Sequence, residues 1–308
     1  MPVFIGNFRS GTTLLINLLG LHPKVTAWFE TKGLCEPLRW LRVLEHPETR
    51  TEESRRVRPD RIPGFSTRKI ADRMRADFEE TILKMAGRID HGKGLHEHYP
   101  IGADQILSSL DQCLTRVDDW ALTLGESPSP GEIKLETGRL IQSLGADECL
   151  ASGKPQWINK TPEITRFGSE LQCCLGAIKI ILVIRDGRHV VRSAAKLGWA
   201  SEEELSIWWK NMILESRRSA EAFPQDYLEI RYEDLLQAPL ATLKAVLGFL
   251  ELDGGNAEAL IEAYNSRIAP EGRRLGADAF LERPGGCSDE PAKVQGLDLD
   301  FLESLGYR

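Results

Sequence analysis

The sequence predicts an α/β fold in which helices cover a central parallel sheet. A short apolar strand, residues 2–6 (PVFIG), runs directly into a glycine loop and then into an apolar helix from Thr12 to Leu21. A second apolar run, Ile178–Ile184 (IKIILVI), is β-branched and nearly continuous, which is typical of a parallel strand buried on both faces. Between these strands, residues 34–150 have a mainly helical pattern. We therefore expect a sheet domain that carries a helical insertion.

The remaining elements follow from the same reading of apolar periodicity. Further strands are expected at 25–29, 156–159 and 227–232. Helices are expected in the insertion at 34–46, 67–90, 103–124 and 132–148, and later in the chain at 187–196, 201–222, 239–250 and 256–266. The stretch 270–297 is rich in glycine, proline and charge and is expected to be a loop. We expect residues 1–308 to form one domain, with the insertion shaping a pocket.

Composition excludes several classes of protein. Hydrophobic residues make up 42% and charged residues 28% of the 308 residues, as in ordinary globular proteins. A net charge of −7 disfavours a general binder of nucleic acid or of membrane surfaces. No apolar run is long enough to span a membrane, and the first residues do not resemble a signal peptide, so we expect a cytoplasmic protein. The six cysteines lack metal-binding spacing, so we expect reduced thiols and no metal site.

The glycine loop GNFRSGTT, residues 6–13, is the first candidate site. Gly6 and Gly11 have the spacing of a phosphate-binding loop, but Thr12 stands where such loops carry a lysine, and Arg9 lies inside the loop. A loop that opens a helix directs backbone N–H groups and the positive end of the helix dipole at one anion. We therefore predict an anion site in a P-loop-like sheet.

The strand at 178–184 points to a second anionic group. It ends in Arg185, where a nucleotide triphosphatase would use a carboxylate near Mg²⁺. Ser193 follows Arg185 by two helical turns within IRDGRHVVRSAAKLGW, residues 184–199. A guanidinium and a hydroxyl held in this way can bind one phosphate together.

Taken together, RSGTT near the N-terminus and RDGRxxVxS after an apolar strand resemble the sulfotransferases that depend on 3′-phosphoadenosine 5′-phosphosulfate (PAPS). The likeness is closest to the protein-tyrosine sulfotransferases and their bacterial relatives. It continues through HPKV, the ET dipeptide, NKTP, WWKN and RYEDLL, which follow in the expected order over about residues 3 to 250. The resemblance implies PAPS as co-substrate, adenosine 3′,5′-bisphosphate (PAP) as product, and transfer without a metal.

The resemblance also implies roles for individual residues. Those expected to hold the nucleotide are Arg9, Ser10, Gly11, Thr12 and Thr13 at its 5′ end, Arg185 and Ser193 at the 3′-phosphate, Tyr232 near the adenine, and Arg273 and Arg274 in a C-terminal loop. Three residues are expected to act on the transferred group. Arg9 and Lys160 contact the sulfuryl or bridging oxygens, and Glu30 takes the proton of the acceptor.

Two assignments have alternatives. His96 or His98 could serve as the base in place of Glu30, because small-molecule sulfotransferases usually use a histidine. Trp208 and Trp209 lie on an amphipathic helix and are interpreted as core residues rather than as a stacking platform.

The function predicted from these residues is sulfuryl transfer to a hydroxyl, less favourably an amine, of a small molecule or natural product. A tyrosyl peptide or a carbohydrate is the alternative acceptor within the family. A P-loop kinase using ATP and Mg²⁺ is the rival enzyme, and a non-catalytic nucleotide-binding module is the rival of another class. Neither nucleic acid nor membrane is expected as a partner, and the sequence leaves the oligomeric state open.

Overall fold

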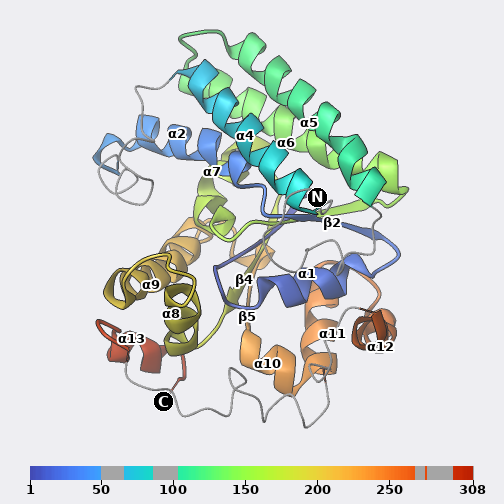
Figure 1. The fold of residues 1–308 in the computed structure, drawn as a ribbon, viewed down its shortest axis with the longest axis vertical. Helices are drawn as coiled ribbons and strands as arrows, with labels where there is room; N and C mark the ends of the chain where they lie inside the picture. Colours follow the sequence, from blue (N-terminus) through green and yellow to red (C-terminus); the bar gives the residue numbers. More distant parts are fainter. Residues whose placement is uncertain (50–65, 86–102, 268–274, 276–293, 308) are drawn as a thin grey trace.

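The computed structural model describes residues 1–49, 66–85, 103–267, 275 and 294–307 (Figure 1). Its centre is a parallel sheet of five strands in the order β2-β3-β1-β4-β5. The strands are β1 Val3–Gly6, β2 Val25–Phe29, β3 Gln156–Lys160, β4 Lys179–Ile184 and β5 Tyr227–Arg231. The predicted fold class and all five predicted strands are thus confirmed, with differences of at most one residue at their ends.

The apolar strands occupy the middle of the sheet. Every residue of β1 and of β4 is buried, because helices cover both faces there. Ile5 of β1 pairs with both Lys160 of β3 and Ile181 of β4, so the three strands end close together. Since all strands are parallel, the residues that follow their carboxyl ends gather at one edge of the sheet.

Helices that follow the strands cover the sheet. They are α1 Thr12–Gly20, α8 Gly187–Ala195, α9 Glu202–Ser219, α11 Pro239–Phe249 and α12 Ala257–Arg267. The group of α8, α9 and the C-terminal helix α13, Leu299–Ser304, lies on the opposite side of β4 and β5 from the group of α1, α11 and α12 in Figure 1. Ser201 and Glu204 form a reciprocal capping box that fixes the start of α9.

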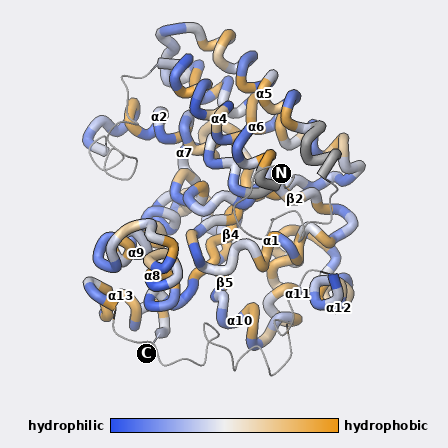
Figure 2. The backbone as a smooth tube through the Cα atoms, in the orientation of Figure 1, coloured by the Kyte–Doolittle hydropathy of each residue, from blue (hydrophilic) through white to orange (hydrophobic). Residues whose placement is uncertain are grey.

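The helical insertion between β2 and β3 is confirmed. It comprises α2 Cys35–Glu45, α4 Thr67–Met85, α5 Ala103–Leu124 and α6 Pro130–Ser152, of which α4, α5 and α6 pack side by side (Figure 1). Hydrophobic and hydrophilic residues alternate along α4 and α5 in Figure 2, as expected for helices with one buried face. The insertion also reaches the sheet edge, because α4 packs against the 3₁₀ turn η1, Lys32–Leu34, just after β2.

Three short helices are absent from the sequence prediction. They are α7 Gly168–Leu175, α10 Tyr232–Gln237 and α13 Leu299–Ser304, and further 3₁₀ turns occur at Pro47–Thr49, Ile164–Phe167 (η5), Pro224–Asp226 and Gly254–Asn256. Tyr232, expected to end a strand, instead begins α10, with Glu233 and Asp234 at the favourable positive end of the helix dipole. Of the predicted C-terminal loop at 270–297, the structure describes only residues 275 and 294–297.

Two apolar clusters hold these layers together. The larger one joins the sheet to α1 and to the insertion, and the smaller one lies between β4, α8, α9 and α13 and includes Trp209 and Phe8. Within the described residues, no helix is both long and apolar enough to cross a bilayer.

Candidate active site

The loop after β1 has the backbone of an anion-binding turn. Asn7, Arg9 and Gly11 have positive φ values of 97°, 53° and 87°. Alternation of this kind is a feature of backbone nests that bind anions. Asn7 is buried and anchors the loop, since its side chain donates to the Val183 carbonyl at 2.9 Å and its backbone N–H donates to the Pro162 carbonyl at 2.7 Å. The loop is therefore held by the two neighbouring strands.

Gly11 is required by its contact with Tyr232. A Cβ atom at position 11 would lie 2.1 Å from Cδ2 of the tyrosine, and the φ of 87° also favours glycine. Gly11 precedes the first turn of α1, which has neither a side-chain cap nor an acidic residue. The first N–H groups of a helix have no partner within the helix, so this end of α1 suits an anion.

Three cationic or polar side chains predicted for the nucleotide lie together. Arg9 Nε donates to Ser193 Oγ at 2.9 Å, and an Nη of Arg185 donates to the Arg9 carbonyl at 3.3 Å. The guanidinium carbon of Arg185 lies 4.5 Å from the centre of the Tyr232 ring. Burial and the nearby charge of Arg185 lower the pKa of Arg9, and Glu30 opposes that shift. The two arginines thus crowd at a place where added negative charge is stabilising.

Lys160 and Glu30 form an ion pair at the ends of adjacent strands. Lys160 Nζ donates to Glu30 Oε1 at 2.7 Å, and the Glu30 N–H donates to the Lys160 carbonyl. The lysine side chain is only 2% exposed, whereas that of the glutamate is 41% exposed. The pair therefore presents its carboxylate to solvent and keeps its ammonium within the protein.

Burial lowers the pKa of Lys160, and the nearby positive charges of Lys32 and Arg9 add to this effect. The Glu30 carboxylate raises the same pKa through charge and hydrogen bonding, but burial prevails. A buried ammonium of this kind gains from additional negative charge nearby, and it is also a better proton donor than an exposed lysine.

The segment that carries Glu30 is clamped by α4. Glu30 has a φ of 49°, which is uncommon for a residue with a side chain. Thr81 donates to its carbonyl at 3.2 Å, and the Asp77 carboxylate accepts from the Gly33 N–H at 2.6 Å. Burial raises the pKa of Asp77 to about 6, although the Gly33 hydrogen bond and Lys32 act in the opposite direction. Helix α4 of the insertion therefore fixes the backbone that carries the Glu30 carboxylate.

A cavity of about 600 Å³ unites these features. The predicted site residues that line it are Arg9, Gly11, Thr12, Thr13, Glu30, Lys160 and Arg185. Ser193 and Tyr232 adjoin it through Arg9 and Gly11. Ser10 does not line it, because its buried hydroxyl donates to the Phe8 carbonyl at 3.1 Å. The fold brings together residues that are up to 223 positions apart, from Arg9 to Tyr232.

Other lining residues were not predicted from the sequence. They are Phe8, Lys32, Pro162, Glu163, Arg166, Trp199, Trp208 and Met212. The interpretation of the tryptophan pair holds for Trp209, which is fully buried in the core, whereas Trp208 is partly buried, packs against the same cluster and also lines the cavity. Successive residues of a helix point about 100° apart, so neighbouring tryptophans cannot share one environment. Leu205, Trp209 and Ile213 recur every fourth residue, and this spacing in the sequence could have shown that Trp209 lies on the core-facing side of the helix and Trp208 on another side.

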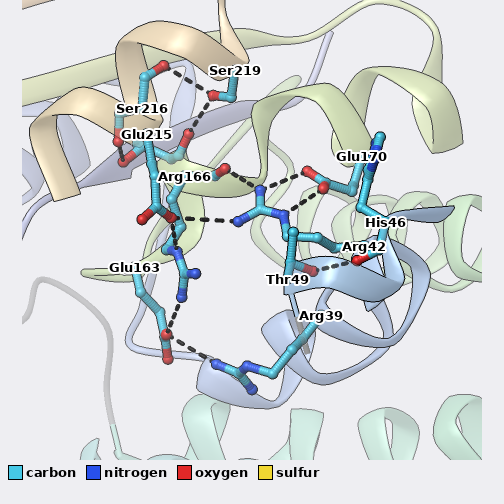
Figure 3. Close-up of polar contacts among 11 residues, drawn as sticks. Arg39, Arg42, His46, Thr49, Glu163, Arg166, Glu170, Glu215, Ser216 and Ser219 are labelled. Atoms are coloured by element: carbon cyan, nitrogen blue, oxygen red, sulfur yellow. Dashed lines mark hydrogen bonds and ion pairs between the residues drawn. The ribbon is translucent and has the colours of Figure 1, made fainter. Parts of the chain in front are cut away.

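Beneath the cavity lies a network of buried ion pairs (Figure 3). Arg166 Nε contacts Glu215 of α9 at 2.7 Å, and Arg42 of α2 contacts Glu170 of α7 at 2.6 Å. Arg39 also of α2 bonds to Glu163 at 3.0 Å. Burial raises the pKa of Glu163, but Arg39, Arg166 and Lys32 outweigh it and leave the pKa lowered. The network ties the insertion to the floor of the cavity.

Some predicted residues lie outside the described part of the chain. These are Arg273 and Arg274, expected to close over the nucleotide, and His96 and His98, the alternative bases. Their roles stay predictions.

Comparisons with known proteins agree with the fold. A model of the sulfotransferase family matches residues 2–254. Among solved structures, the chain is similar to the sulfotransferase domain of the olefin synthase of Synechococcus PCC 7002, with 16% identity, a TM-score of 0.54, and coverage of 100% of this chain and 94% of that one. It is also similar to a sulfotransferase domain of the curacin biosynthetic pathway, with 13% identity, a TM-score of 0.52, and coverage of 100% and 98%. No curated protein sequence gives a significant match. The match to the family model covers most of the chain, which therefore belongs to the sulfotransferase family.

Proposed function

We propose that the protein transfers the sulfuryl group of PAPS to a hydroxyl of a small-molecule acceptor. The observation that carries this proposal is the Lys160–Glu30 pair, 2.7 Å apart, in the same cavity as Arg9 and the anion-binding loop. A cation and a carboxylate beside such a loop supply what sulfuryl transfer needs: charge for the leaving oxygen and a base for the acceptor.

The residues present fit the nucleotide. The uncapped start of α1 and Arg9 would hold the 5′-phosphosulfate, and Arg185 with Ser193 would hold the 3′-phosphate. Arg9 donates to Ser193 in this structure. When the nucleotide binds, this hydrogen bond would be replaced by one from Arg9 to the 5′-phosphosulfate and one from Ser193 to the 3′-phosphate. Gly11 leaves room for Tyr232 to approach the loop, where the tyrosine would border the adenine.

The transfer needs no reactant other than PAPS, the acceptor and the side chains named here. The acceptor oxygen attacks sulfur while its proton moves to the Glu30 carboxylate. The bond from sulfur to the bridging oxygen breaks, and the electron pair stays on the 5′-phosphate of PAP. Lys160 and Arg9 stabilise the charge that builds on that oxygen. The lowered pKa of Lys160 makes its ammonium a strong hydrogen-bond donor for this role.

The two similar solved domains are named for an olefin synthase and for the curacin biosynthetic pathway. These settings support a natural product as the acceptor, rather than the tyrosyl peptide or carbohydrate. The rival P-loop kinase is disfavoured because Thr12 occupies the lysine position of the loop and Lys160 comes from another strand. A non-catalytic module is disfavoured by the Lys160–Glu30 pair, which nucleotide binding alone does not need.

Calorimetry and thermal unfolding with PAPS, PAP, and ATP with Mg²⁺ test the choice of nucleotide. We expect PAPS and PAP to bind and to raise the melting temperature, while ATP with Mg²⁺ does neither. Stabilisation by ATP with Mg²⁺ and not by the 3′-phosphorylated nucleotides would favour the kinase.

A further inference from the structure

One wall of the cavity is apolar and comes from α9, from the turn before that helix and from the loop after β1. Trp208 and Met212 lie one helical turn apart on α9, and Trp199 lies in the turn before that helix. Phe8 completes the wall from the loop after β1, with its ring centre 6.3 Å from that of Trp199.

The wall adjoins the smaller apolar cluster, to which Phe8 belongs and against which Trp208 and Met212 pack, but its other side chains are not fully buried. Leu205, Trp209 and Ile213 form the core-facing stripe of α9 and are completely buried. Trp208 and Met212 lie on the next face and are half-buried, and Trp199 is 49% exposed. Two tryptophans that face a cavity leave a large apolar area in contact with water, which a ligand would cover with a gain in free energy.

The wall adjoins the reactive groups. The α9 face that carries Trp208 and Met212 continues to Glu215, which holds Arg166 at 2.7 Å in the floor of the same cavity. The Lys160–Glu30 pair lines that cavity too. A molecule whose body covers the tryptophans can therefore present a hydroxyl to Glu30 without leaving the cavity.

We infer that Trp199, Trp208 and Met212 bind the ring of an aromatic acceptor, so that the sulfated hydroxyl is phenolic. This inference rests on the proposed function. Tryptophan faces stack on flat rings, and methionine sulfur contacts ring edges favourably. The four apolar residues of the wall offer no carboxylate or amide to a sugar, whose hydroxyls would lose hydrogen bonds to water there.

The test measures transfer from labelled PAPS to 2-naphthol, cyclohexanol and glucose. We expect the specificity constant kcat/KM to be highest for 2-naphthol. Trp208→Ala and Met212→Ala should each raise KM for 2-naphthol about tenfold, as loss of a stacking or sulfur contact predicts. Trp208→Phe should restore most of the loss. Ile207→Ala removes an exposed apolar residue of the same helix outside the cavity lining and should change nothing.

PAP affinity, measured by calorimetry on each variant, separates this inference from the proposed function. The inference predicts that PAP binds all variants as it binds the unmodified protein. It is overturned if glucose or cyclohexanol is the better acceptor, if Trp208→Ala leaves KM unchanged, or if Trp208→Ala weakens PAP binding instead. Failure of the unmodified protein to bind PAP would overturn the proposed function itself.

Discussion

Two groups of charged side chains border the cavity, and they differ in what surrounds them. In the network beneath it, arginines are shared: Arg166 contacts Glu215 and Glu163, and Arg42 contacts Glu170 and Glu215 (Figure 3). The Phe167 ring lies among the arginines, 4.4 Å from the guanidinium carbon of Arg42. These charges are enclosed by protein groups on several elements.

The Lys160–Glu30 pair is different, because its carboxylate side chain is 41% exposed and faces the cavity. Its strand-end position and the positive φ of Glu30 place it where a ligand can reach it. Burial of charge therefore serves two purposes in this protein. The network joins α2, α7, α9 and the cavity-lining residues Glu163 and Arg166 to one another, and the pair holds the proposed cation and the proposed base beside them.

The largest effect is expected on stability when the network loses an arginine. Arg166→Met leaves Glu215 and Glu163 without one of their cations in a site where Arg166 itself is 2% exposed. Breaking a buried pair costs about 3–5 kcal/mol of unfolding free energy. Urea unfolding measures the loss, with Arg217→Met as the control because the Arg217–Glu229 pair is partly exposed and contributes less than about 1 kcal/mol. If both variants lost the same unfolding free energy, the buried network would contribute no more to stability than a partly exposed ion pair.

The same kind of substitution at Lys160 should act on the reaction instead. Lys160→Met removes the cation that we propose lies next to the leaving oxygen, and loss of one such group lowers transfer about 10²- to 10³-fold. Stability should change little, since the exposed Glu30 carboxylate can be hydrated. Single-turnover transfer and urea unfolding measure the two effects, and Lys244→Met at an exposed site is the control. A stability loss as large as that of Arg166→Met would show that Lys160 stabilises the fold as the arginine network does.

Removal of Arg185 should weaken nucleotide binding. Arg185→Ala deletes a charged donor near Arg9 and Ser193, and hydrogen bonds to charged groups contribute about 1.5–3 kcal/mol, so the Kd for PAP should rise about 10- to 100-fold. Calorimetry measures it, and Lys196→Ala, an exposed cation just after α8, is the control. An unchanged Kd in Arg185→Ala would remove this residue from the 3′-phosphate site.

A smaller, pH-dependent effect on stability is expected at Asp77, which holds the segment after β2 through the Gly33 N–H. The pKa of Asp77 is raised from 3.8 to about 6, so the folded protein binds a proton that the unfolded chain has lost between these values. Stability from this group is therefore present below about pH 4 and is lost as the pH rises through about 6, by about 3 kcal/mol at most.

Asp77→Asn keeps an acceptor for the Gly33 N–H and removes the titration. Urea unfolding from pH 4 to pH 7 should show the variant gaining on the unmodified protein as the pH rises. A stability difference that stays constant over this range would contradict the raised pKa.

The sequence predicts much of this molecule because its signals are local. Continuous apolar strands, the glycine loop and long amphipathic helices can be read directly from the sequence. Arg9, Glu30 and Arg185 each follow a strand, and Lys160 ends one. The six-residue helices α10 and α13 are too short to show a period. The apolar wall and the arginine network depend on contacts between distant segments, such as Arg42 with Glu170, which no local pattern encodes.

The proposed role of the Lys160–Glu30 pair is tested most directly by single-turnover transfer from labelled PAPS with Glu30→Gln at saturating nucleotide. Glutamine preserves shape but cannot accept the acceptor's proton. We expect PAP affinity to stay unchanged while the transfer rate falls about 10²- to 10⁴-fold. Transfer within about twofold of the unmodified rate, with PAP bound normally, would contradict the claim that the Lys160–Glu30 pair is where the sulfuryl group moves.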